Sequence, residues 1–335
     1  MSKFSRSRIS LLLVVGIIIT FKNYVIVIGQ TTKPVLVALN KIDATLAIID
    51  PGTMKVVAKV PTGDSPHEVV LSADGKTAFV ANYGERTPGN SISVIDVATA
   101  KELRRVDISP LMRPHGLQMI GGKVYFTSET NRLIARYDPG ANKVDWIMGT
   151  GQNASHMIVG SKDQKRLFTT NIGSDSITAF DFQGVPPSGS KIVHIPIGKQ
   201  PEAIDLSPDG KEVWAGLNTD GSIDIVDTVA NKFKEKVKIG GRAYRVKFTP
   251  DGKYVVCTMV EARELLVIDA ATRKEIKRIK VESVPLGIVF SADGKTAFVS
   301  AGEPDIVLRV DMEMGSVTGK VESGKLPDGI AIAGI

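Results

Sequence analysis

An internal repeat constrains this chain more than any other feature of its sequence. Two mostly apolar residues followed by Asp recur seven times, and consecutive Asp residues of this motif lie 42 to 46 residues apart. The seven are Asp50, Asp96, Asp138, Asp181, Asp227, Asp269 and Asp311. A period of this length indicates an array of equivalent structural units rather than several unrelated domains.

A second repeated motif marks a tight turn within the units. The pattern [S/T]-[A/P]-Asp-Gly occurs at Ser72–Gly75, Ser207–Gly210, Thr249–Gly252 and Ser291–Gly294. Asp-Gly between two alternating apolar runs predicts a β-hairpin, because glycine adopts the positive φ that the turn requires. For the second unit the pattern predicts four strands, at His67–Leu71, Thr77–Asn82, Ser91–Asp96 and Glu102–Ile108, with Asp96 closing the turn that follows it.

Four-stranded units of about 40–45 residues are typical of β-propellers. The sequence therefore predicts an all-β fold, a seven-bladed propeller that occupies residues 31–335 as one domain. Pro34–Asn40 is a second strand without a first, and Pro327–Ile335 is a first strand without the other three. We expect these two segments to pair in one composite blade and so to close the ring.

The stretch from Ser65 to Leu103, which begins SPHEVVLSADGKTAFVANYG and continues as NSISVIDVATAKEL, resembles the YVTN-type propeller repeat. The resemblance extends over about residues 34–335, is close in units two, five, six and seven, and implies the same seven-bladed fold. Units three and four depart from it at the first turn, at Ile120–Lys123 (IGGK) in unit three and at Gly160–Lys165 in unit four. The run KVYFTSETNRLIARYD of unit three also resembles propeller lyases and gluconolactonase-like proteins, which often place a Glu after such a strand.

The first 30 residues differ in character from the rest of the chain. They contain Lys3, Arg6, Arg8 and Lys22 and no acidic residue, and residues 9–21 are largely apolar. A basic segment followed by an apolar one is typical of a secretory signal peptide, so we expect export to the periplasm or the cell exterior. The alternative is an uncleaved membrane anchor at residues 9–28.

The net charge of +6 largely reflects this leader. Removing its four basic residues from the total of 42 leaves 38 basic against 36 acidic residues. A domain with nearly equal numbers of basic and acidic residues lacks the positive charge typical of nucleic-acid-binding proteins, which argues against nucleic acid as a partner. We expect a monomer whose contact with a membrane, if any, is limited to an uncleaved anchor.

Three histidines occupy the same position of the repeat. They lie one residue after the start of the first strand in three successive units, and the chain contains only four histidines. The residues at this position are His67, His115, His156, Glu202, Tyr244, Leu286 and Asp328. Because equivalent strand ends meet around the channel of a propeller, we expect these side chains to share one face, here called the upper mouth.

Three imidazoles on one face suit either of two kinds of chemistry. With a carboxylate from Glu129 or Glu202 they could bind a divalent transition metal of undetermined identity, which would polarise a carbonyl or activate water. Without a metal, a histidine beside Glu129 could remove a proton next to a carbonyl, as in a lyase. The structural alternative is that the histidines only line a polar channel.

Further residues are expected at the same mouth as ligand contacts. Arg113 and Arg245 lie near the starts of first strands and could hold a carboxylate or phosphate. Asn171 ends the second strand of unit four, where the structural alternative is turn formation. The ligand-binding candidates are therefore Glu202, Tyr244, Arg245, Asp328, Arg113 and Asn171.

Two classes of function remain open at this stage. The first is an exported enzyme, a metal-assisted lyase or a lactonase-like hydrolase acting on an oxygen-rich small molecule or sugar acid. The second is a non-enzymatic propeller that binds a protein, peptide or glycan on the same face. No haem, nucleotide or flavin motif is found in the sequence.

Overall fold

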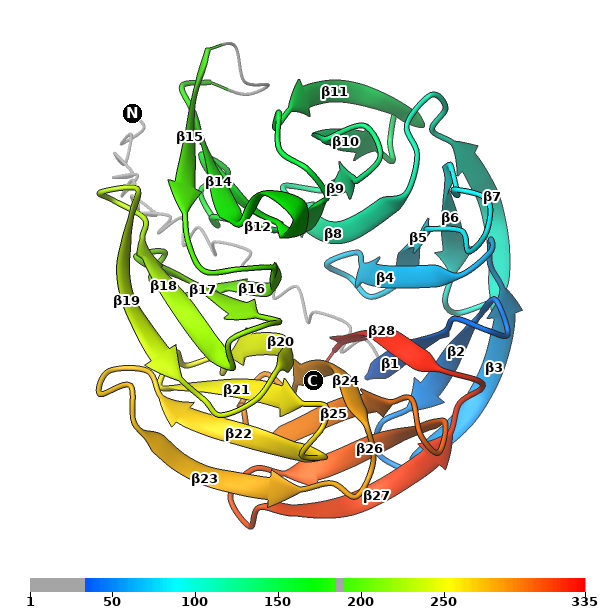
Figure 1. Ribbon diagram of the computed structural model, residues 1–335. Coiled ribbons are helices and arrows are strands. Elements are labelled where there is room, and N and C mark those ends of the chain that lie inside the picture. The colour runs from blue at the N-terminus through cyan, green and yellow to red at the C-terminus, as the bar shows by residue number, and fades with distance from the viewer. Residues whose placement is uncertain (1–33, 185–188, 335) are drawn as a thin grey trace, which may run out of the picture. The chain divides into compact units, whose positions relative to one another are not determined.

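The computed structural model describes residues 34–184 and 189–334, and residues 32–335 form one compact unit. Its sheets are seven four-stranded antiparallel blades, arranged as a ring around a central axis (Figure 1). A cavity lined by all seven innermost strands lies on this axis, and we call the space between these strands the channel. The predicted seven-bladed propeller is confirmed. The predicted leader lies outside the described residues.

Each blade has an innermost strand at the channel and an outermost strand at the rim. The innermost strands are β4 (Pro66–Leu71), β8 (Pro114–Ile120), β12 (Ser155–Gly160), β16 (Pro201–Leu206), β20 (Ala243–Phe248), β24 (Pro285–Phe290) and β28 (Pro327–Ala333). The second strands are β1 (Val35–Asn40), β5 (Thr77–Asn82), β9 (Lys123–Ser128), β13 (Arg166–Asn171), β17 (Glu212–Leu217), β21 (Tyr254–Met259) and β25 (Thr296–Ala301). The third strands are β2 (Thr45–Asp50), β6 (Ser91–Asp96), β10 (Leu133–Asp138), β14 (Ser176–Phe182), β18 (Ser222–Asp227), β22 (Glu264–Asp269) and β26 (Ile306–Asp311). The outermost strands are β3 (Lys55–Pro61), β7 (Lys101–Asp107), β11 (Lys143–Gly149), β15 (Ser190–Pro196), β19 (Lys232–Lys238), β23 (Glu275–Lys280) and β27 (Ser316–Glu322). A short 3₁₀ helix, η1 (Ile172–Ser174), follows β13.

The two ends of the described chain share a blade. β28 pairs antiparallel with β1, with Leu36 opposite Ile332 and Val37 opposite Ala331. The predicted composite blade is confirmed. Its strand order is β28-β1-β2-β3, so the last strand of the chain is the innermost strand of the blade that the first strands begin.

The repeated motifs form the turns predicted for them. At the turn between β4 and β5, the backbone N–H of Gly75 donates to the Ser72 carbonyl (2.8 Å), and Gly75 has φ +70°. Asp96 accepts from the Thr99 backbone N–H at 2.7 Å, which closes the predicted turn after β6. In the third blade, two glycines with positive φ, Gly121 and Gly122, make the hairpin turn in place of Asp-Gly.

The hydrophobic core lies between adjacent blades rather than within one sheet. One buried cluster joins Trp214 of β17 to Phe248 and Cys257 of the next blade. Because both faces of the inner sheets are covered by neighbouring blades, the second and third strands are buried along most of their length. This explains their nearly continuous apolar sequences.

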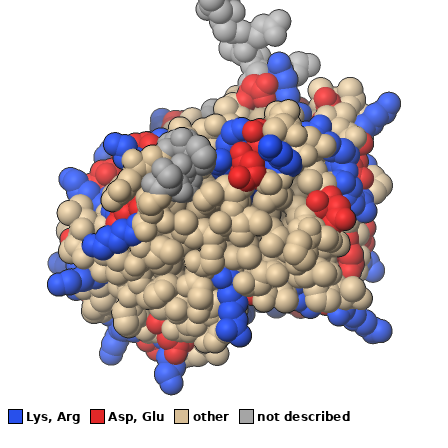
Figure 2. Space-filling view, turned by 90° about the horizontal axis from the view of Figure 1, so that it is seen from above, with Lys and Arg blue, Asp and Glu red and all other residues tan. Residues whose placement is uncertain are grey.

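The outermost strands alternate exposed and partly buried residues and are rich in charge. β7 reads KELRRVD and β19 reads KFKEKVK. Charged side chains on an exposed strand edge oppose pairing with another chain. Figure 2, which views the ring from one side, shows basic and acidic side chains intermixed around a broad area without charged residues. Among the described residues there is no helix long and apolar enough to cross a membrane.

Ring closure generates a first test. Removing Pro327–Ile335 exposes the channel-facing edge of β1 and opens the ring, so we expect a lower melting temperature or loss of a single cooperative transition. The matched control removes only Gly334 and Ile335, which follow the end of β28. Thermal unfolding followed by circular dichroism measures both. Equal melting curves for the long truncation and the full chain would show that closure does not stabilise the ring.

Candidate functional site

All seven innermost strands carry an irregularity at the same place. The pairing register between the innermost and second strands shifts just after the strand begins, for example between Pro66 and Glu68 and between Pro114 and Leu117. The shift in each blade spans the aligned position, which holds His67, His115, His156, Glu202, Tyr244, Leu286 and Asp328. A bulge of this kind redirects a side chain away from the regular pleat. The aligned residues therefore come from equivalent backbone positions around the upper mouth.

The three histidines of successive blades form a continuous cluster. His67 Nδ1 lies 3.0 Å from His115 Nε2, within hydrogen-bond distance. The rings of His115 and His156 are tilted against each other with centroids 3.8 Å apart. The structure thus brings together the three imidazoles that the repeat register aligned.

Glu129 and Tyr83 extend this cluster. One oxygen of Glu129 contacts His156 Nδ1, and the other accepts a 2.6 Å hydrogen bond from the Tyr83 hydroxyl. The centroid of the Tyr83 ring lies 4.4 Å from that of the His67 ring. The contacts therefore form a closed circuit from His67 through His115, His156, Glu129 and Tyr83 back to His67. We call His67, Tyr83, His115, Glu129 and His156 the histidine cluster.

Arg113 supports the cluster from outside. Its guanidinium carbon lies 4.6 Å from the centre of the Tyr83 ring, and its side chain donates to the backbone carbonyls of Gly84 and Glu85. In this arrangement Arg113 fixes the loop that carries Tyr83. It contacts the cluster through the tyrosine ring and through its backbone carbonyl, which accepts from the Glu129 N–H at 3.1 Å.

The opposite half of the mouth is a network of paired charges. Asp328 is fully buried and lies 3.2 Å from Lys41 Nζ and 3.7 Å from Arg245 Nη2. The Tyr244 hydroxyl donates to Asp328 at 3.1 Å. Lys41 was not predicted, because it follows the second strand of the composite blade and reaches Asp328 only through ring closure.

Glu202 and Asn171 have different surroundings. Glu202 accepts a 2.6 Å hydrogen bond from Asn218 and lies at the mouth. Asn171 is fully buried, and its side chain bonds Ser155, Ser176 and Thr178 within its own blade. These hydrogen bonds hold the start of β12 against β14, which fits the structural alternative that the sequence left open for Asn171.

An ion pair crosses the channel below the mouth. Arg245 of β20 and Glu68 of β4 are in contact although 177 residues separate them in the chain. Glu68 was not predicted, because nothing in its local sequence distinguishes it. Both side chains are largely buried, so the pair forms a polar layer beneath Asp328 and the histidine cluster.

Burial controls the protonation of these groups. Desolvation lowers the pKa of His67 from 6.5 to about 3, with the nearby Lys41 acting in the same direction. Desolvation also lowers the pKa of His115 well below its ordinary value. Burial and then Glu129 raise the pKa of Tyr83 to about 12. Burial opposes ionisation of Asp328, but Lys41 and Arg245 hold its pKa below the usual range.

Hydroxyl groups set the position of the histidines from one blade to the next. Thr127 accepts a hydrogen bond from the backbone N–H of Gly116 (2.9 Å) and donates to the carbonyl of His156 (2.6 Å). The same bridge between neighbouring innermost strands is made by Thr170, Thr258 and Ser300. These residues were not predicted as part of the site, although a Thr or Ser just before the end of the second strand was visible in the sequence.

Among the residues that the structure describes, one group can offer metal ligands together. Single ligand atoms of His115, Glu129 and His156 all lie within 4.8 Å of one another. His115 is 3% exposed, and its Nδ1 is buried without a hydrogen-bond partner. His67 occupies the other side of the His115 ring.

A family model described as a YNCE-like beta-propeller matches residues 23–330. The chain belongs to the YNCE-like beta-propeller family. No curated protein sequence matches it significantly.

Solved structures share the fold of this family member at low sequence identity. The hydrazine synthase of Kuenenia stuttgartiensis superposes with a TM-score of 0.68 at 19% identity, over 79% of this chain and 88% of that chain. A "putative 6-phosphogluconolactonase" from Bacteroides uniformis ATCC 8492 superposes with a TM-score of 0.75 at 13% identity, over 90% and 100% of the two chains. A functionally unknown protein from Desulfotomaculum acetoxidans DSM 771 gives 0.75 at 13% identity, over 89% and 98%. At these identities the likeness shows the fold alone.

Close approach of the innermost strands gives a second test. A Cβ added at Gly116 would lie 2.7 Å from the carbonyl oxygen of His156, so Gly116→Ala must displace β8 or β12. We expect a loss of about 1–3 kcal/mol in the free energy of unfolding and changed NMR signals of His115 and His156. The control is Gly149→Ala, where a Cβ meets nothing within 4 Å. Equal stability and unchanged histidine signals in Gly116→Ala would contradict tight packing at the site.

The depressed histidine pKa values predict the pH dependence of stability in the metal-free protein. Between pH 6.5 and about 3 the unfolded chain binds a proton at His67 that the folded protein does not, so acidification favours unfolding. We expect the free energy of unfolding to fall below pH 6.5 by up to about 1.4 kcal/mol per pH unit for each such histidine. Urea denaturation at pH 7.5 and 5.0 measures this loss, which should be smaller in His67→Gln. An identical loss in the variant would show that His67 does not contribute.

Proposed function

We propose that the histidine cluster binds a divalent transition metal and that the protein is a metal-assisted hydrolase of the lactonase type. The observation that carries this proposal is the convergence of His115, Glu129 and His156, whose ligand atoms lie within 4.8 Å of one another. Two imidazoles and one carboxylate form a donor set that suits Zn²⁺ and other first-row transition metals. Three protein ligands leave a coordination position for water or substrate.

The unpartnered nitrogen of His115 supports the proposal. Buried polar atoms in folded proteins are almost always hydrogen-bonded, and a buried one without a partner requires an explanation. A metal at Nδ1 would satisfy this nitrogen while His67 holds the ring through Nε2. Similarly, the Tyr83 hydroxyl would orient Glu129. Hydrogen bonds from outer residues to metal ligands are a general feature of protein metal sites.

A bound metal would supply Lewis acidity and an activated water molecule. In lactone hydrolysis the water oxygen adds to the carbonyl carbon, the ring C–O bond breaks, and a proton passes to the departing oxygen. Glu202 and Asn218 lie on the same mouth and offer hydrogen-bonding groups to substrate hydroxyls. Two structures that share the fold are titled as putative 6-phosphogluconolactonases, and for this reason we propose lactone hydrolysis, rather than the lyase reaction, as the activity to test first.

One observation favours a second candidate, a binding protein without catalytic activity. The cluster is largely buried, with His156 and Glu129 each 11% exposed at the side chain. In the other half of the mouth, Asp328 is already paired with Lys41 and Arg245. A site of this kind suits a tightly held metal or small ligand that is bound and not turned over.

Metal binding by an untagged protein separates these functions from a purely structural cluster. We expect one equivalent of Zn²⁺, Mn²⁺, Cu²⁺ or Ni²⁺ per chain by calorimetric titration and by elemental analysis. His115→Ala, His156→Ala and Glu129→Gln should each weaken binding at least tenfold, since each removes a ligand. His194→Ala, on the exposed outer strand β15, is the matched control.

The outcomes distinguish the proposals. If no metal binds to the wild-type protein, the metal site is wrong. If metal binds but neither sugar lactones nor simple esters are hydrolysed faster than with the chelated protein, the hydrolase function is wrong and the binding function stands. Metal-dependent hydrolysis that is lost in Glu129→Gln supports the enzyme.

A further inference from the structure

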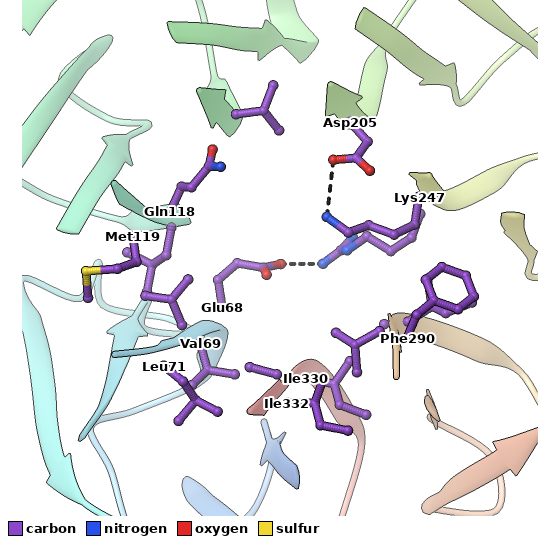
Figure 3. Close-up of a pocket in the computed structure, with 18 of the residues that line it drawn as sticks. Glu68, Val69, Leu71, Gln118, Met119, Asp205, Lys247, Phe290, Ile330 and Ile332 are labelled. Carbon is purple, nitrogen blue, oxygen red and sulfur yellow. Dashed lines mark hydrogen bonds and ion pairs between the residues drawn. The ribbon is translucent and has the colours of Figure 1, made fainter. Parts of the chain in front are cut away.

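The channel contains a cavity at the end opposite the upper mouth. It has a volume of about 770 Å³ and is lined by residues from the later part of all seven innermost strands (Figure 3). The Asp-Gly turn residues at its rim, such as Ser72 and Thr249, identify this end as the one remote from the histidines. We call it the lower cavity.

The walls of the lower cavity are predominantly apolar. Figure 3 shows aliphatic, thioether and aromatic side chains of β4, β8, β24 and β28 around it, with Asp205 of β16 and Lys247 of β20 on the remaining side. The labelled apolar residues are Val69, Leu71, Met119, Phe290, Ile330 and Ile332. A cavity of this size with mostly apolar walls and a few polar groups is typical of small-molecule sites.

The cavity is separate from the histidine cluster. The ion pair between Glu68 and Arg245 joins opposite sides of the channel and forms the inner boundary of the cavity. Both side chains are nearly buried, at 13% and 11% exposure, so the pair closes much of the cross-section. A ligand of the lower cavity therefore meets Glu68 and Arg245 and not the imidazoles.

Most of the charge inside the cavity is already compensated. Glu68 pairs with Arg245, and Asp205 pairs with Lys247 at 3.1 Å. The remaining charged residue, Lys162, is exposed at the rim. Because burying an uncompensated charge is costly, this interior suits an uncharged ligand.

One polar atom in the wall lacks a partner. Gln118 is directed toward the channel interior, and its Oε1 is buried without accepting a hydrogen bond from any described residue (Figure 3). A buried carbonyl oxygen of this kind requires a donor. An O–H or N–H group on a ligand would supply it.

We propose that the lower cavity binds a small uncharged amphipathic molecule, with an aromatic or aliphatic body held by the apolar walls and one hydroxyl or amide donor bound by Gln118. This second binding site is independent of the metal and of the proposed hydrolysis.

A matched pair of probes tests the proposal. 2-Naphthol carries the donor, and 2-methoxynaphthalene has the same body without it. We expect saturable binding of 2-naphthol, followed by its fluorescence, and binding of 2-methoxynaphthalene about two- to tenfold weaker, as befits one hydrogen bond. In Gln118→Leu the two probes should bind equally. Gln183→Leu, at an exposed glutamine outside the cavity, should keep the difference.

Two further variants locate the binding. Leu71→Trp fills the cavity and should abolish binding of both probes. ¹³C-methyl methionine NMR should show that 2-naphthol shifts the Met119 signal. His115→Ala and treatment with a chelator should leave probe binding unchanged, so failure of the metal site is distinguished from failure of this one.

Three results would overturn the proposal. They are the absence of saturable 2-naphthol binding below millimolar concentration, binding that persists in Leu71→Trp, and wild-type binding that does not discriminate between the two probes.

Discussion

A hydroxyl that bridges neighbouring innermost strands determines where the residues of the channel lie. In four of the seven blades a Thr or Ser near the end of the second strand accepts from one innermost strand and donates to the next. Each bridge ends on the carbonyl of an aligned residue: His156, Glu202, Leu286 or Asp328. The bridges therefore couple blade spacing directly to the geometry of the upper mouth.

Glycines complete this arrangement by allowing close backbone contact. A Cβ at Gly116, Gly287 or Gly329 would collide with the carbonyl oxygen of the aligned residue in the next blade. With these strands held close, the channel is narrow enough for Glu68 and Arg245 to meet across it. The same constraint thus brings the imidazoles into contact and places the Glu68–Arg245 ion pair between the upper mouth and the lower cavity.

The upper mouth and the lower cavity have opposite physical character. The upper mouth concentrates titratable groups in a buried setting, where desolvation keeps His67 and His115 neutral. The lower cavity has apolar walls and compensated charges. A single ring of innermost strands achieves this because polar residues are concentrated near the strand starts and apolar residues near the strand ends. Leu286 at the start of β24, and Gln118, Asp205 and Lys247 in the later parts of β8, β16 and β20, depart from this pattern. The two proposed binding sites therefore lie on one axis.

The sequence by itself determined the fold, and it determined which backbone positions carry the candidate site residues. The repeat period, the Asp-Gly turns and the two unpaired terminal segments depend on local backbone chemistry, so the blades, the closure by Pro327–Ala333 and the alignment of His67, His115 and His156 could be predicted. Only the tertiary structure decided which side chains meet. The contacts of Lys41 with Asp328 and of Glu68 with Arg245 join residues far apart in the chain, and no local pattern encodes them. The hydrogen bonds of Asn171 within its blade and the lower cavity likewise depend on how seven blades pack around one axis. The sequence pattern of a strand shows which of its residues face inward, but it does not show which residues of other strands they contact.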